Sequence, residues 1–452
     1  MKVSNRIPLI AACAIFGISL LGCTAKSNES QSGPAKVEVR QTDGQYRLYV
    51  NDQPFYIKGA GLEYGSQEKL REHGANSFRT WSVVNGRESG RAVLDRAQKN
   101  GLMVAMGLDV DHERHGFDYD NPEMVAKQFA LLKSQVLELK DHPALLMWVV
   151  GNELNFEKSH KVWDHVNDLS RMIHEVDPNH PTTTTLAGFQ PDTVKMVQTR
   201  AADLDFISFQ MYYDIINLPK YLHEAKWDKP YLVTEWGATG HWECGKTSWD
   251  APLENDSTTK ADLYEKRYRA VIESDPKLCL GSYVFLWGNK QERTPTWYGM
   301  FLDSGEETAP VDVMHYVWNG KWPVNRSPRL EGVWLNDKTA QQSVRLKAGE
   351  SYPARVASSD PDGDKLIYHW EVMEESTSTN VGGDHEHRPP HVPDLIADDA
   401  KPEIKLRAPN RPGAYRLFVY VYDGKGSAGH ANIPFYVEDT SQTAATESPV
   451  RN

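Results

Sequence analysis

Short apolar runs alternate with amphipathic stretches from about residue 54 to residue 320, which predicts a repeating strand–helix architecture. The helical spacing of apolar residues is clearest over 123–139, 161–176 and 259–273. Pro143 ends the first of these helices, because proline cannot continue a helix. The predicted strands are 55–59, 77–81, 103–108, 144–150, 182–185, 206–212, 231–234 and 281–286.

Eight strand–helix units within about 270 residues are what a (β/α)8 TIM barrel requires. A doubly wound parallel sheet is the alternative, but such a sheet rarely needs eight units. The apolar runs are rich in β-branched residues, as parallel strands buried on both faces are. We therefore predict an α/β fold with a catalytic (β/α)8 barrel over residues 36–325.

The helical period disappears after a polar stretch that contains Pro323 and Pro328. Short alternating runs follow, separated by turn signals at 360–364 and 423–426. This pattern predicts an immunoglobulin-like β-sandwich over 326–439, and the tail at 440–452 reads as disordered. The predicted strands of this domain are 343–346, 366–372, 403–407, 415–422 and 432–437.

Residues 1–22 have the pattern of a targeting segment. Lys2 and Arg6 precede an apolar stretch at 7–21, which is too short to span a membrane as a helix. Such a segment is removed on export, so we leave it out of the predicted fold.

The sequence Leu20-Leu21-Gly22-Cys23 resembles the lipobox of bacterial lipoproteins. This resemblance implies cleavage before Cys23 and lipid attachment to it; an ordinary signal peptide is the alternative. Thr24 stands where an inner-membrane retention signal would have aspartate, which favours the outer membrane. Residues 23–35 are rich in small polar residues and predict a flexible tether. We therefore expect a membrane partner, reached through the lipid anchor.

The formal net charge is −12 and the calculated pI is about 5.8, without a basic stripe. This balance argues against a nucleic-acid partner and suits neutral substrates. Cys244 is expected in a loop above the barrel and Cys279 near the bottom of the next strand. Export permits a disulfide, but this placement argues against one.

Two predicted strands end abruptly in a carboxylate, in Trp-Val-Val-Gly-Asn-Glu at 148–153 and Tyr-Leu-Val-Thr-Glu-Trp-Gly at 231–237. The site of a (β/α)8 barrel forms at the C-terminal ends of its strands, so Glu153 and Glu235 should face one cleft. Paired carboxylates on rigid strands are the usual machinery for breaking a glycosidic bond. Two unrelated salt bridges are the alternative.

Polar and aromatic residues gather at the same ends of other predicted strands. Arg79 and Trp81 end the second strand, Tyr212 ends the sixth, and Trp287 follows the eighth. Aromatic faces stack on pyranose rings, so two or three of the rim tryptophans are expected to contact sugar and the others to pack under loops. These tryptophans are Trp81, Trp236, Trp242, Trp287 and Trp297.

The Gly-Asn-Glu sequence at 151–153, with a second strand-end glutamate three strands later, resembles clan A of the glycoside hydrolases. The stretches 55–59, 74–80 and 142–148 look like the catalytic barrel of family 2, over roughly residues 54–290. In family 2, sugar-binding and immunoglobulin-like domains precede the barrel, whereas here a predicted β domain follows it. That order, with the lipobox, looks more like family 158, whose members are endo-β-1,3-glucanases.

The resemblance implies a role for each matching residue. Glu153 would be the general acid/base and Glu235 the nucleophile of a retaining double displacement. Asn152 would bind the sugar 2-hydroxyl, and Arg79 would hold Glu235 ionised by charge and hydrogen bonding.

Three further positions follow from the same resemblance. Tyr212 would donate to the nucleophile, and Trp287 would form the floor of the −1 subsite. Gln210 stands where many clan members have His or Asn, which leaves the contact at that position open. Trp81 and Trp236 complete the predicted substrate-binding set, and no cofactor or metal is expected.

The leading hypothesis is a lipid-anchored endo-β-1,3-glucanase acting on a polysaccharide or oligosaccharide. One rival changes the substrate to mannan, another β-glucan or a galactoside, or the reaction to transglycosylation. A second rival is a non-catalytic glycan-binding lipoprotein. A retaining enzyme should have its two carboxyl groups about 5–5.5 Å apart.

Three polar segments give weaker indications of a binding site. The loop 109–120 and the segment 382–387, with Arg388 and His391, carry His and acidic residues without a recognised metal-ligand spacing. The second of these could bind a metal or reach over the cleft, but a solvated loop is the common reading. Asp360, Asp362 and Asp364 have calcium-like chemistry in a turn that usually folds without an ion.

Overall fold

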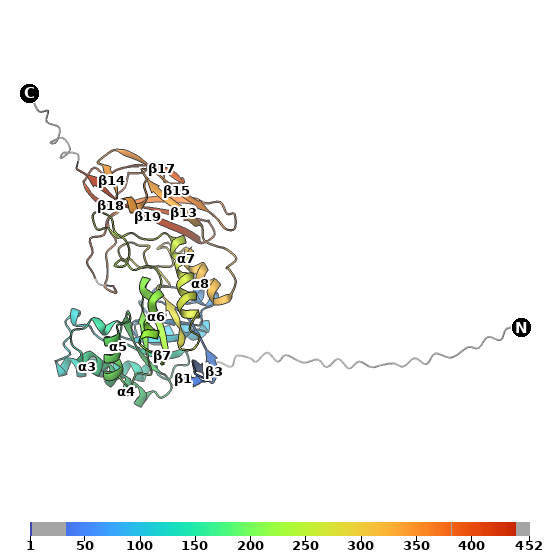
Figure 1. Cartoon of the computed structure of the whole chain (residues 1–452), viewed down its shortest axis with the longest axis vertical. Coiled ribbons are helices and arrows are strands. Elements are labelled where there is room, and N and C mark those ends of the chain that lie inside the picture. Colours follow the sequence, from blue (N-terminus) through green and yellow to red (C-terminus); the bar gives the residue numbers. More distant parts are fainter. Residues whose placement is uncertain (2–32, 381, 440–452) are drawn as a thin grey trace, which may run out of the picture. The chain divides into compact units, whose positions relative to one another are not determined.

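The computed structural model describes residues 1, 33–380 and 382–439, and those from Gly33 onward form one compact unit. The predicted signal segment, Cys23, the tether before Gly33 and the C-terminal tail lie outside the described residues. The element order is shown in Figure 1.

Eight parallel strands close into a barrel, which confirms the predicted TIM-barrel class. All eight predicted strands are present, with ends that differ by a few residues. Around the barrel, β10 is followed by β11, β4, β5, β6, β7, β8 and β9. The strands are β4 (Ile57–Gly61), β5 (Ser77–Arg79), β6 (Met103–Leu108), β7 (Leu145–Val150), β8 (Thr182–Ala187), β9 (Phe206–Gln210), β10 (Tyr231–Glu235) and β11 (Cys279–Val284).

Helices follow the strands and cover the barrel, as the alternating pattern predicts (Figure 1). Several begin at a side chain that caps free backbone N–H groups, such as Ser66, Ser89 and Asp256. The predicted helix 259–273 is helical throughout but changes to π-helix from Tyr268 to Glu273. The α-helices are α1 (Gln67–Glu72), α2 (Gly90–Asn100), α3 (Pro122–Leu139), α4 (Lys161–Val176), α5 (Pro191–Arg200), α6 (Leu218–Glu224), α7 (Ser257–Arg267) and α8 (Ala309–Asn319).

An antiparallel sheet precedes the barrel and was not predicted from the sequence. It consists of β1 (Val37–Thr42), β2 (Gln45–Val50) and β3 (Gln53–Phe55). Val37 and Leu48 pack in one apolar cluster with residues of the barrel strands, including Ile57 and Leu146. Because these contacts lie at the start of the strands, the opposite end of the barrel is left for the site.

The C-terminal domain has two β-sheets that share one apolar core, so the predicted sandwich is present. Its immunoglobulin-like character and the boundary at residue 325 stay predictions. One sheet contains β12 (Glu307–Thr308), β14 (Val344–Lys347), β16 (Ile367–Glu374), β18 (Gly413–Tyr422) and β19 (Ser427–Glu438). The other contains β13 (Arg329–Leu335), β15 (Ser351–Ser359) and β17 (Glu403–Arg407).

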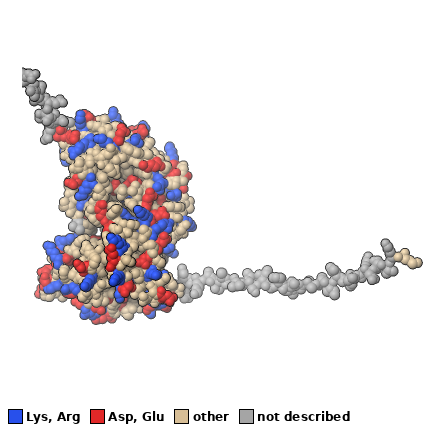
Figure 2. Space-filling model, viewed as in Figure 1, with Lys and Arg blue, Asp and Glu red and all other residues tan. Residues whose placement is uncertain are grey.

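The barrel segment and the β domain share a sheet. Glu307 and Thr308 of β12, just before α8, pair with Ser427 and Ala428 of β19. Cys244 and Cys279 are both free thiols, as their predicted positions indicated. Among the described residues, no helix is long and apolar enough to cross a membrane. Acidic and basic side chains are interspersed on the face shown in Figure 2.

Candidate active site

A cleft of about 360 Å³ opens at the C-terminal ends of the barrel strands. Asn152, Glu153 and Glu235 line it together, so the structure brings both predicted carboxylates into one cavity. Trp81 and Tyr212 line the same cavity, and Arg79 contacts Glu235 from a fully buried position.

Glu235 is the last residue of β10 and is almost fully buried. Its Oε1 accepts hydrogen bonds from Arg79 Nη1 at 3.1 Å and from the Trp81 indole Nε1 at 2.8 Å. Its Oε2 accepts from the Tyr212 hydroxyl at 2.9 Å. Three donors therefore hold this side chain in one orientation, in the manner that suits an ionised carboxylate.

Asn152 is held by its carbonyl oxygen, which leaves its amide NH2 available to a ligand. Oδ1 accepts from Arg79 Nη2 at 3.0 Å and from Gln210 Nε2 at 2.8 Å. These bonds fix the amide orientation, because only the oxygen can accept. Gln210, which departs from the clan pattern, therefore orients Asn152 by donating to its side-chain oxygen.

Glu153 lies in a turn with left-handed backbone, at φ 52°, shortly after Gly151 at φ 75°. Its backbone N–H donates to the Thr185 carbonyl at 3.1 Å, which ties the turn to β8. Burial and then repulsion by Glu235 raise the pKa of Glu153 to about 8, against the opposing attraction of Arg79. A carboxylic acid that keeps its proton near neutral pH is suited to proton donation.

Arg79 connects the Glu235 carboxylate to the Asn152 amide. Its guanidinium is fully buried, contacts Glu235 and Asn152, and lies 4.9 Å from the centre of the Trp81 ring. Burial lowers the pKa of this guanidinium, and the charge of Glu235 counters that effect. The end of β5 thus positions both Glu235, the nucleophile candidate, and Asn152, the candidate for sugar binding.

Two predicted substrate contacts lie elsewhere. Trp236 and Trp287 are fully buried and are not among the residues that line the cleft. Trp236 packs on Tyr264 of α7 and on Tyr268, and Trp287 donates from Nε1 to the Ser66 carbonyl. The structure thus does not give Trp287 the position of a sugar-facing floor.

For Trp236, the reason is the alternation of side chains along an extended segment. Glu235 faces the cleft, so the next residue, Trp236, faces the helices outside. Strand β11 ends at Val284, and Phe285 follows it into the cleft lining. Phe285 packs edge-on against Trp81 and Tyr212.

Other lining residues were not singled out as substrate contacts. Tyr298, Lys290 and Glu292 come from the loop after β11. Trp242, one of the rim tryptophans, also lines the cleft and is 57% exposed, whereas Trp297 is buried. The run of polar residues after the eighth predicted strand is the sequence feature that could have identified this loop.

The weaker metal hypotheses gain no support from the side-chain geometry. The described residues contain no group of three His, Cys, Asp or Glu side chains placed to hold a metal ion. His112 instead pairs with Glu157 at 2.5 Å, and Asp364 pairs with Lys425. The segment 382–387 does reach the cleft, which Gly382, Gly383 and Asp384 help to line.

The structure is a TIM barrel with a pair of carboxylates at its rim, an arrangement that glycosidases use. The family profile described as "Glycosyl hydrolases family 2, TIM barrel domain" matches residues 67–265. This stretch contains Arg79, Asn152, Glu153, Tyr212 and Glu235. The match therefore supports an enzyme of the glycosidase class and a family 2-like barrel.

Two curated relatives and one solved structure are similar to this chain. A β-glucuronidase of Paenibacillus borealis is 26% identical over 270 residues, 51% of this chain and 43% of that protein. A β-glucuronidase of Streptococcus agalactiae is 26% identical over 283 residues, 53% of this chain and 45% of that protein. A solved structure of a β-glucuronidase from Ruminococcus gnavus in complex with uronic deoxynojirimycin has a TM-score of 0.50 and 16% identity, covering 63% of this chain and 53% of that one.

The chain spans less than half the length of the curated relatives that it matches. The likeness to the solved structure concerns the fold alone.

Proposed function

We propose that this protein is a retaining β-glycosidase in which Glu235 is the nucleophile and Glu153 is the general acid/base. The observation that carries the proposal is the contrast between the two acids. Glu235 accepts from three donors, whereas burial and charge repulsion raise the pKa of Glu153. Two carboxyl groups in such different surroundings are suited to opposite tasks.

In the first step, Glu235 attacks the anomeric carbon while the Glu153 proton passes to the departing glycosidic oxygen. In the second step, ionised Glu153 takes a proton from water, which attacks the anomeric carbon and releases Glu235. The free amide NH2 of Asn152 donates to the sugar 2-hydroxyl, and this bond strengthens as positive charge develops on the ring. A retained anomeric configuration in the first product, followed by NMR, tests this mechanism; an inverted product contradicts it.

The charge of the cleft favours a neutral sugar. Arg114 and Lys290 are the Arg and Lys side chains among the lining residues of the cleft, and both have acidic neighbours. The acidic lining side chains are Glu63, Asp109, Asp111, Glu153, Glu235, Glu292 and Asp384. Even with Glu153 protonated, the lining has an excess of acidic side chains that repels an anionic sugar. We therefore propose a neutral β-glycan, first a β-1,3-glucan cleaved internally, as the resemblance to family 158 implies.

A β-glucuronide is the second candidate, because both curated relatives are named β-glucuronidases. Recognition of a uronate needs a cation that is available to its carboxylate. Lys290 is in the cleft lining, but its Nζ lies 2.7 Å from Glu292 Oε2. The carboxylate of a glucuronide would therefore have to share the Lys290 ammonium group with the Glu292 carboxylate.

A panel of laminarin, mannan, galactan and 4-nitrophenyl β-glucoside, β-galactoside and β-glucuronide separates these substrates. We expect oligosaccharides from laminarin and little turnover of the glucuronide. Turnover of the glucuronide alone would overturn the neutral-glycan proposal, and activity on mannan or galactan without laminarin would reassign the sugar. If Glu153→Ala and Glu235→Ala left the protein's glycan-related function untouched, a non-catalytic glycan-binding role would replace the enzyme.

We also propose that Cys23 carries a lipid that anchors the protein to the bacterial outer membrane. The support is the lipobox at 20–23 and the polar tether after it. Metabolic labelling with an alkyne fatty acid should mark the wild type and not Cys23→Ser. Equal labelling of both would contradict the anchor.

A further inference from the structure

One segment of the C-terminal β domain reaches the active-site cleft of the barrel. Between β16 and β17, Gly382, Gly383 and Asp384 line the same cavity as Glu153 and Glu235. These three residues come from a different domain than the rest of the lining. We call residues 376–380 and 382–388 the wall segment.

Glu386 attaches the wall segment to the loop after β11. Its Oε1 accepts from the Arg293 backbone N–H at 3.0 Å and from Gln291 Nε2 at 3.3 Å. Ser376 in the same segment donates to this oxygen at 2.8 Å. Burial disfavours the charge of Glu386, but these donors outweigh it and lower the pKa of the carboxyl group.

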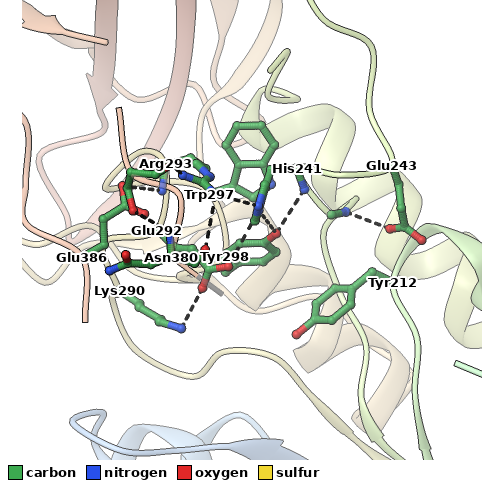
Figure 3. Close-up of polar contacts among 12 residues, drawn as sticks. Tyr212, His241, Glu243, Lys290, Glu292, Arg293, Trp297, Tyr298, Asn380 and Glu386 are labelled. Carbon is green, nitrogen blue, oxygen red and sulfur yellow. Dashed lines mark hydrogen bonds and ion pairs between the residues drawn. The ribbon is translucent and has the colours of Figure 1, made fainter. Parts of the chain in front are cut away.

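Arg293 strengthens the same attachment from the barrel side. Its guanidinium donates to the carbonyl oxygens of Ser378 and Asn380. Asn380 Nδ2 in turn donates to the His385 carbonyl at 2.7 Å, which holds the segment's own shape. Figure 3 shows Glu386 and Asn380 with Arg293 and the neighbouring Lys290 and Glu292.

Asp384 attaches the other side of the segment to the loop after β6. Its Oδ1 lies 3.1 Å from His115 Nε2 and 3.8 Å from Arg114 Nη2. In the closed barrel, β4 and β5 lie between β11 and β6. Because the wall segment contacts the loops after β11 and β6, it bridges two parts of the cleft rim that β4 and β5 separate along the barrel.

We propose that the β domain completes the substrate-binding site and that Asp384 is a specificity-determining residue. Its carboxylate accepts hydrogen bonds from hydroxyl groups of sugar units beyond the unit that Glu235 attacks. Glu235 ends a barrel strand, whereas Asp384 lies against a loop well past the end of β6. Single-unit substrates therefore depend on it less than oligosaccharides do. This inference rests on the proposed glycosidase function.

The test uses the full-length protein with Asp384→Ala and Asp384→Asn, on β-1,3-linked glucotetraose and 4-nitrophenyl β-glucoside. For Asp384→Ala, the ratio of kcat/KM for the tetraose to that for the glucoside should fall about 10-fold, mainly through KM, since one charged hydrogen-bond acceptor is lost. Asp384→Asn keeps the size of the side chain and one acceptor oxygen, so its ratio should fall less.

The matched control is Asp398→Ala, which also removes an ion-paired aspartate of the β domain, but one paired with Lys401 and not lining the cleft. It should keep the wild-type ratio. A wild-type ratio in Asp384→Ala, or equal losses on both substrates, would overturn the inference.

Binding separates this inference from the proposed function. Quenching of tryptophan fluorescence by the tetraose reports binding without turnover, because Trp81 and Trp242 line the cleft. If the wild type hydrolyses neither substrate, the glucanase proposal fails. The inference is then supported if the affinity for the tetraose is about 10-fold lower in Asp384→Ala than in the wild type. It is overturned if the affinity is unchanged or if the wild type does not bind the tetraose.

Discussion

At the scale of single residues, the site depends on how two chemically identical side chains are surrounded. Glu235 accepts from Arg79, Trp81 and Tyr212, which orients it for attack. Glu153 is half-buried beside that negative charge, and desolvation and this charge raise its pKa. The difference in surroundings supports the step that we propose for each acid.

Replacement of each acid by glutamine should therefore give different substrate profiles. Glu235→Gln removes the nucleophile, so turnover of every substrate should be lost alike. Glu153→Gln removes a proton donor and should slow glycan hydrolysis by about 10²–10⁴-fold. An aryl glycoside with a good leaving group needs no protonation and should lose much less. Glu138→Gln, on the exposed part of α3, is the control, and equal losses in both active-site variants would contradict the assignment.

The raised pKa of Glu153 predicts the alkaline side of the pH profile. The free enzyme needs protonated Glu153, so kcat/KM should decrease as the pH rises through about 8. In Glu153→Gln, the residual activity on an aryl glycoside should lack this decrease. A decrease that persists unchanged in the variant would assign it to another group.

The same shift predicts a change in stability with pH. In the unfolded chain Glu153 titrates near 4.5, whereas in the folded protein it keeps its proton to about 8. Its contribution to folding is thus fully present below about 4.5 and is lost as the pH rises through about 8. The free energy of unfolding should depend less on pH in Glu153→Gln, as measured by urea denaturation across this window.

At the scale of elements, the turn after β7 decides where Asn152 and Glu153 lie. Gly151 has φ 75°, and a Cβ there would come within 2.4 Å of Leu154 Cδ1. Gly188, after β8, has the same φ of 75°, but a Cβ there would meet nothing within 4 Å. The two glycines form a matched pair that differs in packing.

Gly188→Ala should therefore cost only the left-handed strain, on the order of 1–2 kcal/mol. Gly151→Ala should cost more and should also reduce kcat, because relief of the overlap displaces the catalytic turn. Thermal unfolding and kcat of both variants check this. Equal effects would mean that packing against Leu154 does not position Glu153.

At the scale of the whole molecule, a buried polar cluster joins the barrel to the β domain. Glu254 lies 2.6 Å from Lys260 Nζ of α7 and accepts from Asn432 Nδ2 of β19 at 2.6 Å. Burial opposes the charge of Glu254, but Lys260 and His430 reverse the effect and lower its pKa to about 2. Its stabilising contribution is present above about 4.5 and is lost as the pH falls towards 2.

Glu254→Gln should destabilise the protein by about 3–5 kcal/mol, because it leaves the Lys260 charge buried without a partner. Glu265→Gln is the comparison, since its pair with Arg269 is partly exposed and should be worth less than about 1 kcal/mol. Chemical denaturation of both variants gives the values. A small effect in Glu254→Gln would show that water reaches Lys260.

The C-terminal β domain was predicted less completely than the barrel. Strand β15 pairs on both sides, but it contains Pro353 and buries few of its residues, so its apolar signal is weak. Strand β13 is an edge strand interrupted by Gly332. The prediction missed both, because short, half-exposed strands carry little apolar periodicity.

The sequence by itself determined the barrel and its two acids. Buried parallel strands need continuous apolar runs, and the ends of such runs meet at one rim, so the pattern alone places Glu153 and Glu235 together. The local pattern was sufficient for the barrel strands because consecutive residues encode the direction and the burial of a strand.

Only the tertiary structure decided which neighbours surround those acids. The direction of Trp236 depends on the exact residue at which β10 ends, since successive side chains point to opposite sides. The contact of Asp384 with His115 joins residues 269 positions apart, which no local pattern encodes. The proposed catalytic pair is thus predictable from the sequence, whereas the residues that line the rest of the cleft follow only from the fold.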